Sequence, residues 1–210
     1  MAKEDAQSAA DYVPRTRSLK ALAGAAADCR GCPLWRDATQ TVFGEGPRSA
    51  EMMLVGEQPG DREDIAGAPF VGPAGAVLDQ ALTEAGIDRG DAYLTNAVKH
   101  FKWKPRGPRR IHQTPRVGEI EACRPWLEAE IAAVAPRALI ALGATATRSL
   151  FGPKPRVMRD RGRPLETELA EVGAITIHPS AVLRADRAER EAARQGMVED
   201  LAAVAAAIRR

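Results

Sequence analysis

Residues that can ligate metals, attack electrophiles or bind polyanions are concentrated between positions 94 and 127. This segment contains two of the three histidines, His100 and His112, and one of the three cysteines, Cys123. It is also strongly basic, because several Lys and Arg residues and no acidic residue occur from position 92 to 118. Metal-binding, nucleophilic and nucleic-acid-binding chemistry could therefore all be located in this one segment.

The three cysteines suggest a metal site more than a disulfide framework. Cys29 and Cys32 form a CxxC pair in a loop that contains Gly and Pro, and Cys123 lies far from them in the sequence. An odd number of cysteines in a reducing compartment argues against structural disulfides. A site with three thiolates needs a fourth ligand, for which His100 is the candidate. Zinc and iron–sulfur clusters both accept cysteine and histidine, so the spacing does not separate them.

His112 is the candidate nucleophile. It lies in a basic loop next to Arg109 and Arg110, and a neutral imidazole is a good nucleophile. The alternative is a histidine that only contacts phosphate. Two basic segments, 99–116 and 154–163, suggest a polyanionic partner, although two solvated loops would have the same composition.

The alternation of apolar runs and amphipathic segments predicts an α/β fold. Strands are expected at 51–57, 92–98, 137–142 and 172–177, and helices at 18–27, 74–85, 114–134, 143–152 and 185–208. The segments 58–73 and 99–113 are expected to be loops. Ser18 and Thr114 are predicted N-caps, and Gly86 is predicted to follow a helix end. Strands that alternate with helices form a parallel sheet, whose ligands bind beyond the carboxyl ends of the strands.

Polar residues lie at this edge of the predicted sheet. Glu57 could orient a water molecule or stabilise a cation, or it could be a solvated turn residue. Asn96 could hydrogen-bond to the edge of a base or to a loop backbone. Phe70 could stack on a base or fill a core beneath a loop. His178 could donate to a carbonyl and Ser180 could hold a phosphate, or both could belong to the first turn of a helix.

Two further groups have less specific interpretations. Leu183 and Arg184 could be an apolar wedge with a phosphate-binding neighbour. Asp61, Glu63 and Asp64 could bind a metal, but solvated loop acids are the simpler interpretation.

Length and composition bound the class of protein. With 210 residues, ordinary apolar content and a net charge of +2, the chain is expected to form one domain at 17–210 after a loose tail at 1–16. It has no run of about 18 apolar residues and no apolar signal segment at its start, so no membrane span and a cytoplasmic location are expected.

Five motifs together resemble one known family. They are Gly-Glu-Gln-Pro-Gly-Asp-x-Glu-Asp (56–64), Pro-Phe-Val-Gly-Pro-Ala-Gly (69–75), Leu-Thr-Asn-Ala-Val-Lys (94–99), Ala-Cys-Arg-Pro-Trp-Leu (122–127) and His-Pro-Ser (178–180). Their order over residues 19–208 resembles that of the uracil-DNA glycosylase superfamily, in its iron–sulfur (family 4) branch. The resemblance implies a three-layer α/β/α sandwich with a four-stranded parallel sheet in the order 2-1-3-4. It also implies a [4Fe–4S] cluster.

Two departures from the family 4 pattern resemble the UdgX subgroup. The cysteine that follows Asn-Ala-Val-Lys in family 4 is replaced here by His100, and a longer loop carries Arg-Arg-Ile-His at 109–112. In that subgroup three cysteines and one histidine hold the cluster, and the loop histidine attacks the sugar and stays covalently attached to DNA. By matched position, the implied cluster ligands are Cys29, Cys32, His100 and Cys123, and the implied nucleophile is His112.

The resemblance also implies a substrate and a set of roles. The substrate is uracil-containing DNA, preferably single-stranded, bound by a monomer. The implied catalytic residues are His112, Glu57, His178 and Gln58, and the implied uracil-binding residues are Gly56, Gln58, Phe70, Asn96 and His178. The implied DNA contacts are Lys99, Arg109, Arg110, Ser180, Leu183 and Arg184. Two other functions stay open: a hydrolytic glycosylase that turns over, and a non-catalytic iron–sulfur protein that binds or senses DNA.

Overall fold

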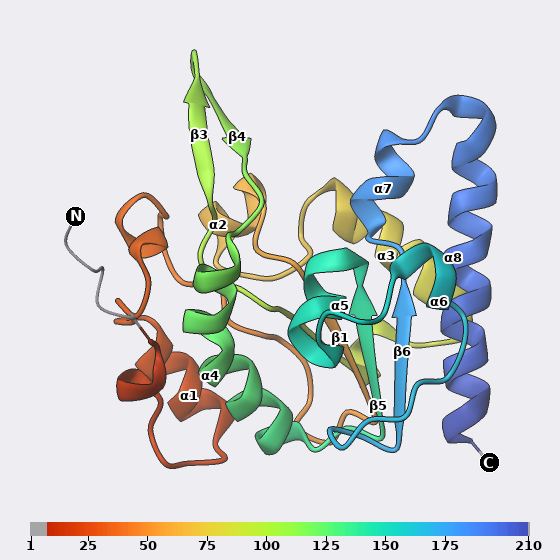
Figure 1. The fold of residues 1–210 in the computed structure, drawn as a ribbon, viewed down its shortest axis with the longest axis horizontal. Helices are drawn as coiled ribbons and strands as arrows, with labels where there is room; N and C mark the ends of the chain where they lie inside the picture. Colours follow the sequence, from red (N-terminus) through yellow and green to blue (C-terminus); the bar gives the residue numbers. More distant parts are fainter. Residues whose placement is uncertain (1–7, 210) are drawn as a thin grey trace.

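A computed structural model describes residues 8–209 of the chain. At its centre is a four-stranded parallel sheet in the order β2-β1-β5-β6 (Figure 1). The strands are β1 (Met52–Gly56), β2 (Ala92–Asn96), β5 (Ala138–Leu142) and β6 (Val172–Thr176). Two further strands form a separate hairpin between β2 and β5. When these two are left out of the numbering, the order of the sheet is the expected 2-1-3-4. The observed bounds differ from the predicted ones by at most two residues.

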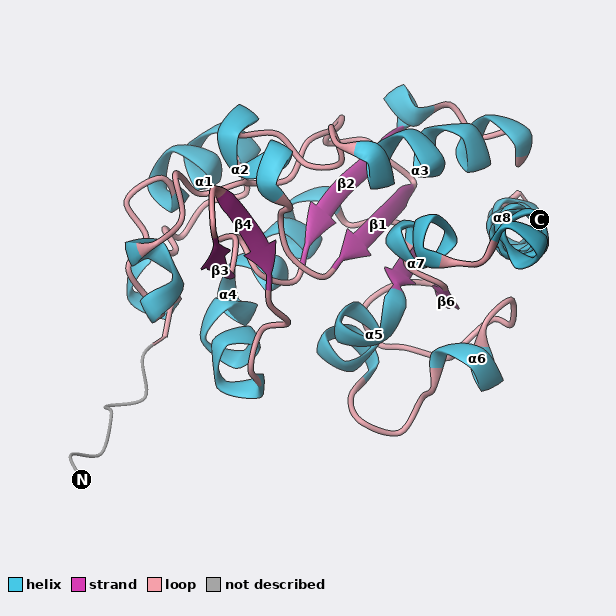
Figure 2. Cartoon of the chain, turned by 90° about the horizontal axis from the view of Figure 1, so that it is seen from above, coloured by secondary structure: helices cyan, strands magenta, loops and turns pink. Residues whose placement is uncertain are grey.

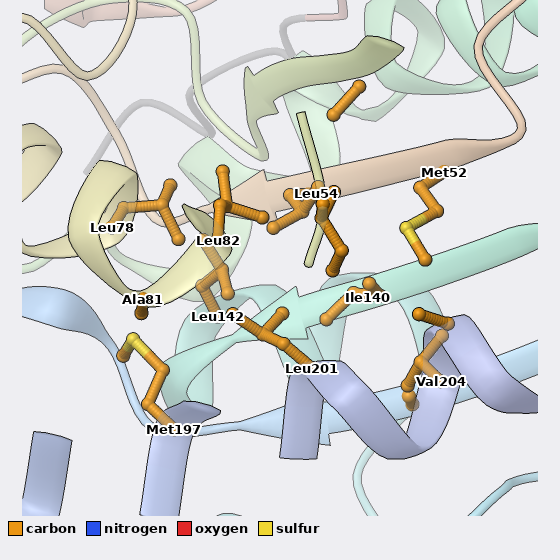
Figure 3. Packing of buried hydrophobic residues seen from close by; sticks show 14 of the residues in the cluster. Met52, Leu54, Leu78, Ala81, Leu82, Ile140, Leu142, Met197, Leu201 and Val204 are labelled. Carbon is orange, nitrogen blue, oxygen red and sulfur yellow. The ribbon is translucent and has the colours of Figure 1, made fainter. Parts of the chain in front are cut away.

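Helices cover both faces of the sheet (Figure 2). One face packs on α3 (Pro73–Glu84), α7 (Pro179–Arg184) and α8 (Arg187–Ile208), and the other on α4 (Val117–Val134) and α5 (Gly143–Phe151). Leu54 points to the first face and Val55 to the second, because successive strand residues point to opposite sides. Figure 3 shows Leu82 of α3 and Leu201 of α8 in the first core together with Leu54 and Ile140. The predicted three-layer α/β/α class is confirmed.

The N-terminal segment forms a third buried group with α4. Helix α1 (Leu19–Ala26) begins after Ser18, whose Oγ accepts a hydrogen bond from the Ala21 N–H at 3.3 Å, as expected of an N-cap. Two short 3-10 helices flank α1 in the sequence: η1 (Ala10–Tyr12) precedes it and η2 (Pro33–Arg36) follows it.

The tail predicted at 1–16 is only partly described. Residues 1–7 lie outside the described part of the chain. Ala9 is buried, and its N–H donates to the backbone oxygen of Ala122 in α4 at 2.8 Å. The described part of this segment is therefore packed against α4 through a main-chain hydrogen bond and is not a loose tail.

Two segments that were predicted as loops contain regular structure. Within 58–73, α2 (Asp61–Ala66) forms because the Glu63 carboxylate accepts the Gly60 N–H at 3.1 Å and caps the helix. Within 99–113, the antiparallel strands β3 (Trp103–Arg106) and β4 (Arg109–His112) form a hairpin. Gly107 in its two-residue turn has φ +58°, a conformation that glycine adopts most easily. The hairpin projects from the body of the molecule (Figure 1).

The helices also differ from the prediction in two places. Helix α4 begins at Val117 and not after Thr114, because Glu119 accepts the Arg116 N–H at 2.6 Å and makes Arg116 the N-cap. The helix predicted at 185–208 is preceded by the separate helix α7. The remaining elements are α6 (Val157–Asp160) in the second basic segment and η3 (Arg89–Asp91) before β2. Between residues 8 and 209, none of the helices has the length and apolar character needed to cross a bilayer.

Candidate active site

A cavity of about 640 Å³ opens at the edge of the sheet where the parallel strands end. Its walls come from the segment after β1, the end of β2, the end of the hairpin and the start of α7. The predicted site residues in these walls are Glu57, Gln58, Phe70, Asn96, His112, His178, Ser180 and Arg184. A smaller hollow of about 330 Å³ is lined by none of them. The larger cavity is therefore the candidate active site.

The carboxylate of Glu57 connects the end of β1 to the hairpin. Its Oε1 lies 3.2 Å from Nε2 of His112, and its Oε2 accepts a hydrogen bond from the hydroxyl of Thr145 in α5. Burial alone raises the pKa of Glu57, but the hydrogen bonds from His112 and Thr145 outweigh this effect and leave the pKa below its ordinary value. Glu57 is therefore an anion at neutral pH, placed to accept a proton from His112.

His178 is held as a neutral imidazole by the first turn of α7. Its Nδ1 accepts the Ser180 N–H at 3.1 Å and lies 2.8 Å from the Ser180 hydroxyl, which accepts from Arg184 at 3.0 Å. Because Nδ1 is an acceptor, the proton of the neutral ring resides on Nε2. Burial lowers the pKa of His178 to about 4, against the opposing effect of Glu57. At neutral pH the ring is thus a hydrogen-bond donor in the cavity wall.

Gly56, at the end of β1, lies against Phe70 and Asn96, two residues of the cavity wall. A Cβ at position 56 would lie 2.4 Å from Oδ1 of Asn96 and 2.7 Å from Cζ of Phe70, so only glycine leaves both side chains where they are. Phe70 has φ +55°, a left-handed conformation that costs a non-glycine residue about 1–3 kcal/mol. Gly75 permits this conformation, since a Cβ there would lie 1.8 Å from the Phe70 carbonyl oxygen. The backbone thus fixes an aromatic ring in the wall at a cost in strain.

Arg110 fastens the hairpin to α2. Its guanidinium lies 2.5 Å from Oδ1 of Asp61 and from Oδ2 of Asp64, and 5.4 Å from the centre of the Phe101 ring. The interpretation of the acids as solvated is wrong for Asp64, which is fully buried, and for Glu63, which is 8% exposed and caps α2. Most of the hydrogen-bonding capacity of Arg110 is therefore used within the protein.

Lys99 is buried below the cavity, which corrects its prediction as a DNA contact. Its ammonium donates to the carboxylate of Glu130, to Oγ1 of Thr95 at 2.7 Å and to the backbone oxygen of Asn96 at 2.7 Å. The side chains of Lys99 and Glu130 are 1% and 0% exposed. Glu130 also accepts from the hydroxyl of Tyr93 at 3.0 Å. An ion pair this deeply buried cannot reach a phosphate, and it instead fixes the backbone of Asn96.

The three cysteines share one buried group between α1 and α4. Burial raises the pKa of Cys32 to about 11 and that of Cys123 to about 12. The indole N–H of Trp126 donates to Sγ of Cys29 at 3.2 Å, and the Lys99 N–H donates to Sγ of Cys123 at 3.3 Å. N–H groups directed at sulfur stabilise negative charge on it, as the thiolate ligands of a metal centre require.

His100 lies next to Lys99 and is also buried. Its Nε2 is 3.0 Å from the hydroxyl of Thr41, and burial lowers its pKa to about 4. The ring is therefore neutral at pH 7, which is the form that ligates metals. Within the described part of the chain, no three His, Cys, Asp or Glu side chains are grouped as ligands of one metal ion. Three thiols and one neutral imidazole are donor types that metal centres accept.

The roles of two residues at the site were not predicted. Thr145 follows the Gly-Ala pair after β5, but nothing in the local sequence indicates that it donates to Glu57. Glu130 did have a signal, because it continues the buried stripe of α4 that contains Cys123 and Trp126. A carboxylate at a core-facing position of a helix indicates a buried partner.

Comparison with known proteins agrees with this fold. The profile of the Uracil DNA glycosylase superfamily matches residues 43–202. The chain is 42% identical over 164 residues to a Type-4 uracil-DNA glycosylase of Pyrobaculum aerophilum, covering 75% of this chain and 80% of that protein. It is 40% identical over 158 residues to a Type-4 uracil-DNA glycosylase of Thermotoga maritima, covering 74% and 78%.

The sheet, the cavity at its carboxyl edge and the matched profile define one class: the chain belongs to the uracil-DNA glycosylase superfamily. Within that superfamily, the two relatives above place its similarity in the type 4 branch.

Proposed function

We propose that the protein excises uracil from DNA and that His112 then bonds covalently to the deoxyribose. The observation that carries the proposal is the 3.2 Å contact between Nε2 of His112 and Oε1 of Glu57, in a cavity that also contains Phe70 and His178. The names of the type 4 relatives support uracil in DNA as the substrate.

Recognition uses the flat and polar walls of the cavity. The extruded uracil stacks on Phe70, and the Asn96 amide forms hydrogen bonds with the edge of the base. The amino group of cytosine would not match this hydrogen-bonding pattern. Extruding a base costs a few kcal/mol and least for an unpaired one, so we expect a preference for single-stranded DNA. We also propose that the protein acts as a monomer. The proposed DNA contacts that are exposed are Arg109, Leu183 and Arg184, with Ser180 partly exposed beside them.

Cleavage of the glycosidic bond places negative charge on uracil and positive charge on the sugar. The electron pair of the C1′–N1 bond leaves with N1 of uracil. His178 donates its Nε2–H to a carbonyl oxygen of the departing base and stabilises the anion. The Glu57 carboxylate stabilises the oxocarbenium ion that remains. The lowered pKa values of both groups keep His178 neutral and Glu57 ionised at neutral pH.

Capture of the sugar by His112 completes the reaction. As the bond to C1′ forms, the Glu57 carboxylate removes the proton from Nε2 of His112, so that the Nε2 electron pair is available to C1′. Glu57 then passes this proton to the uracil anion, directly or through solvent. The products are neutral uracil and a protein–DNA adduct. A positioned nucleophile can reach an effective concentration of about 10⁵–10⁸ M, which favours imidazole over water.

We also propose that Cys29, Cys32, His100 and Cys123 hold a [4Fe–4S] cluster. The three thiols lie in one buried group, two of them accept N–H donors, and the neutral His100 lies next to the N–H that serves Cys123. When bound, the cluster supplies a structural cross-link. Because His100 precedes the hairpin and Cys123 follows it, this link restrains the segment that carries His112.

The cofactor proposal is tested on purified protein. An absorbance band at about 400 nm with stoichiometric iron is the expected result for an iron–sulfur cluster. A colourless protein with stoichiometric zinc would contradict the proposal. Variants in which Ser replaces Cys29 or Cys123 should lose both the band and the iron.

A hydrolytic glycosylase is the second candidate function. The side chain of His112 is 48% exposed, so water has access to the place where the histidine would attack. In this alternative His112 contacts phosphate, water attacks C1′, and the protein turns over.

Incubation with a uracil-containing single-stranded oligonucleotide separates the two functions. The covalent proposal predicts a band of lower mobility on a denaturing gel, with one equivalent of uracil released per adduct. Repeated uracil release without such a band would support the hydrolytic alternative. A protein that binds the oligonucleotide and releases no uracil would be a non-catalytic DNA-binding protein.

A further inference from the structure

Two arginines lie over one indole ring in the segment that follows α1. Cζ of Arg30 lies 4.9 Å and Cζ of Arg36 lies 5.8 Å from the centre of the Trp35 ring. Both arginines are exposed, and the ring is half-buried. Among residues 8–209, neither guanidinium donates a hydrogen bond or forms an ion pair, in contrast to Arg110. Stacking on an indole uses the face of a guanidinium, so the N–H groups at its edges stay free for an anion.

This stack lies next to the stem of the hairpin. The indole N–H of Trp103, the first residue of β3, donates to the backbone oxygen of Asp37 at 2.8 Å, and Asp37 directly follows Arg36. Trp103 is also paired with His112 across the hairpin, and residues that are directly opposite share one face. A surface therefore leads from His112 over Trp103 to the stack. We call its four residues the Arg–Trp strip: Arg30, Trp35, Arg36 and Trp103.

The stem of the hairpin is anchored, which fixes where the strip begins. Gln58 was expected to act on uracil, but its amide faces the stem. Its Oε1 accepts the Lys102 N–H at 3.1 Å, and its Nε2 donates to the backbone oxygens of Lys102 at 3.2 Å and Gln113 at 3.1 Å. Lys102 directly precedes Trp103, and Gln113 directly follows His112. The strip and the cavity therefore keep a constant relative position.

The strip and α7 lie on opposite sides of the cavity. The hairpin and α7 flank the carboxyl edge of the sheet in both views (Figures 1 and 2). The exposed DNA contacts proposed on α7 are Leu183 and Arg184. A strand whose uracil occupies the cavity leaves it in two directions, towards its 5′ end and towards its 3′ end. If α7 contacts the strand on one side, the strip is placed to contact it on the other.

The chemistry of the strip fits single-stranded DNA. Unpaired bases stack on indole rings and on guanidinium planes, and phosphates accept hydrogen bonds from the free N–H groups of arginine. Stacking of this kind does not depend on the identity of the base, because every base has a flat face. The strip therefore suits a flanking segment of any sequence.

We propose that the Arg–Trp strip binds the single-stranded DNA on one side of the uracil. The inference rests on the proposed function, which makes DNA the ligand. Trp35 and Trp103 stack on bases, and Arg30 and Arg36 bind phosphates. These residues are outside the cavity wall, so they increase the affinity for the strand and leave the rate of glycosidic cleavage in the bound complex unchanged.

The test compares two strands of about 16 nucleotides, one with the uracil close to its 5′ end and one with it close to its 3′ end. The variant is Arg30→Gln/Trp35→Leu/Arg36→Gln. The measurement is the rate of uracil release under single-turnover conditions at increasing protein concentration. We expect the concentration that gives the half-maximal rate to rise at least about tenfold with one strand and less than about twofold with the other. The maximal rate should be unchanged with both strands.

The matched control is Lys154→Gln/Arg156→Gln, which also removes two exposed cations. Its half-maximal concentration should equal that of the wild type with both strands. If the triple variant does not fold, Arg30→Gln/Arg36→Gln retains the indole ring. It should show the same one-sided change with a smaller increase, of at least about threefold.

An unchanged half-maximal concentration overturns the inference. Equal increases with the two strands also overturn it, since they would show only a general attraction for DNA. If the stack only stabilises the fold, the urea midpoint falls and the half-maximal concentration does not change.

The assay also separates a failure of the proposed function from a failure of the strip. A protein that releases uracil without an adduct contradicts the covalent step, and the release rates still test the strip. A protein that releases no uracil contradicts the proposed function. The affinities for the same two strands, measured by fluorescence anisotropy, then decide whether the strip binds DNA.

Discussion

The two basic segments, 99–116 and 154–163, are alike in composition and different in structure. The first forms the β3–β4 hairpin and brings His112 into the cavity, whereas the second contains the short helix α6 and contributes no residue to the cavity. A similar basic composition therefore does not place two segments at the same site.

The cations of the first segment serve two purposes. Lys99 and Arg110 face acids within the protein, and the exposed cations at the tip of the hairpin are Lys104, Arg106 and Arg109. In the second segment Arg161 pairs with the buried Asp200 at 2.8 Å. Lys99, Arg110 and Arg161 each lie next to a carboxylate and stabilise the fold, whereas the cations at the hairpin tip are exposed to a ligand.

The largest expected effect concerns His112. His112→Ala removes the nucleophile, so the adduct should disappear entirely while uracil is released slowly by water attack. The matched control is Arg159→Ala in the second basic segment, which should form as much adduct as the wild type. The measurement is the denaturing gel with quantified uracil. An adduct that persists in His112→Ala would place the nucleophile elsewhere.

The next effect is on stability. Lys99→Met leaves the Glu130 carboxylate buried without its cation, and such losses lower the free energy of unfolding by about 3–5 kcal/mol. Urea denaturation monitored by tryptophan fluorescence measures the change. The double variant Lys99→Met/Glu130→Gln should recover part of the loss, because the uncompensated charge is gone. A loss below about 1 kcal/mol in the single variant would show that Lys99 is not structural.

A smaller effect is expected on DNA affinity. Replacing Lys104, Arg106 and Arg109 together by Gln removes three exposed cations from the hairpin tip. If each contacts one phosphate of a single strand, the slope of log K against log salt should become less steep by about 2. The matched variant replaces Lys154, Arg156 and Arg159 by Gln, and we expect little change of slope. Equal changes in the two variants would mean that both basic segments contact DNA.

The smallest effect is expected for Arg161→Met. Asp200 keeps its hydrogen bond from Thr176, so the free energy of unfolding should fall by only about 1–2 kcal/mol. Adduct formation should not change, since neither Arg161 nor Asp200 lines the cavity. If the free energy of unfolding falls as much as in Lys99→Met, the Arg161–Asp200 pair is as important for stability as the Lys99–Glu130 pair.

The sequence predicted the sheet and the location of the candidate site, because both depend on local patterns. Each parallel strand is a short apolar run, and polar residues that line the cavity lie at the end of these strands or directly after them, as with Asn96 and Glu57. Parallel strands end at the same edge, so residues far apart in the chain, such as Asn96 and His178, meet there.

The hairpin and the buried ion pair depend on contacts that no local pattern indicates. Pro105 lies inside β3 and the segment lacks alternating apolar residues, so a strand was not expected. Arg110 forms an ion pair with Asp64, which lies 46 positions earlier, and Lys99 forms one with Glu130, which lies 31 positions later. Only the folded chain shows that these charges neutralise each other.

The anchoring of the hairpin has a consequence for protein engineering. Residues 102–113 form one projecting element, which suggests that the hairpin alone could be transferred to another protein (Figure 1). Yet the element is attached through Gln58 at its base and through Asp61 and Asp64 on α2. A chimera that transplants the hairpin into a type 4 relative should therefore include positions 57–64 of this chain as well, because the recipient must supply the proton acceptor and both attachment points together.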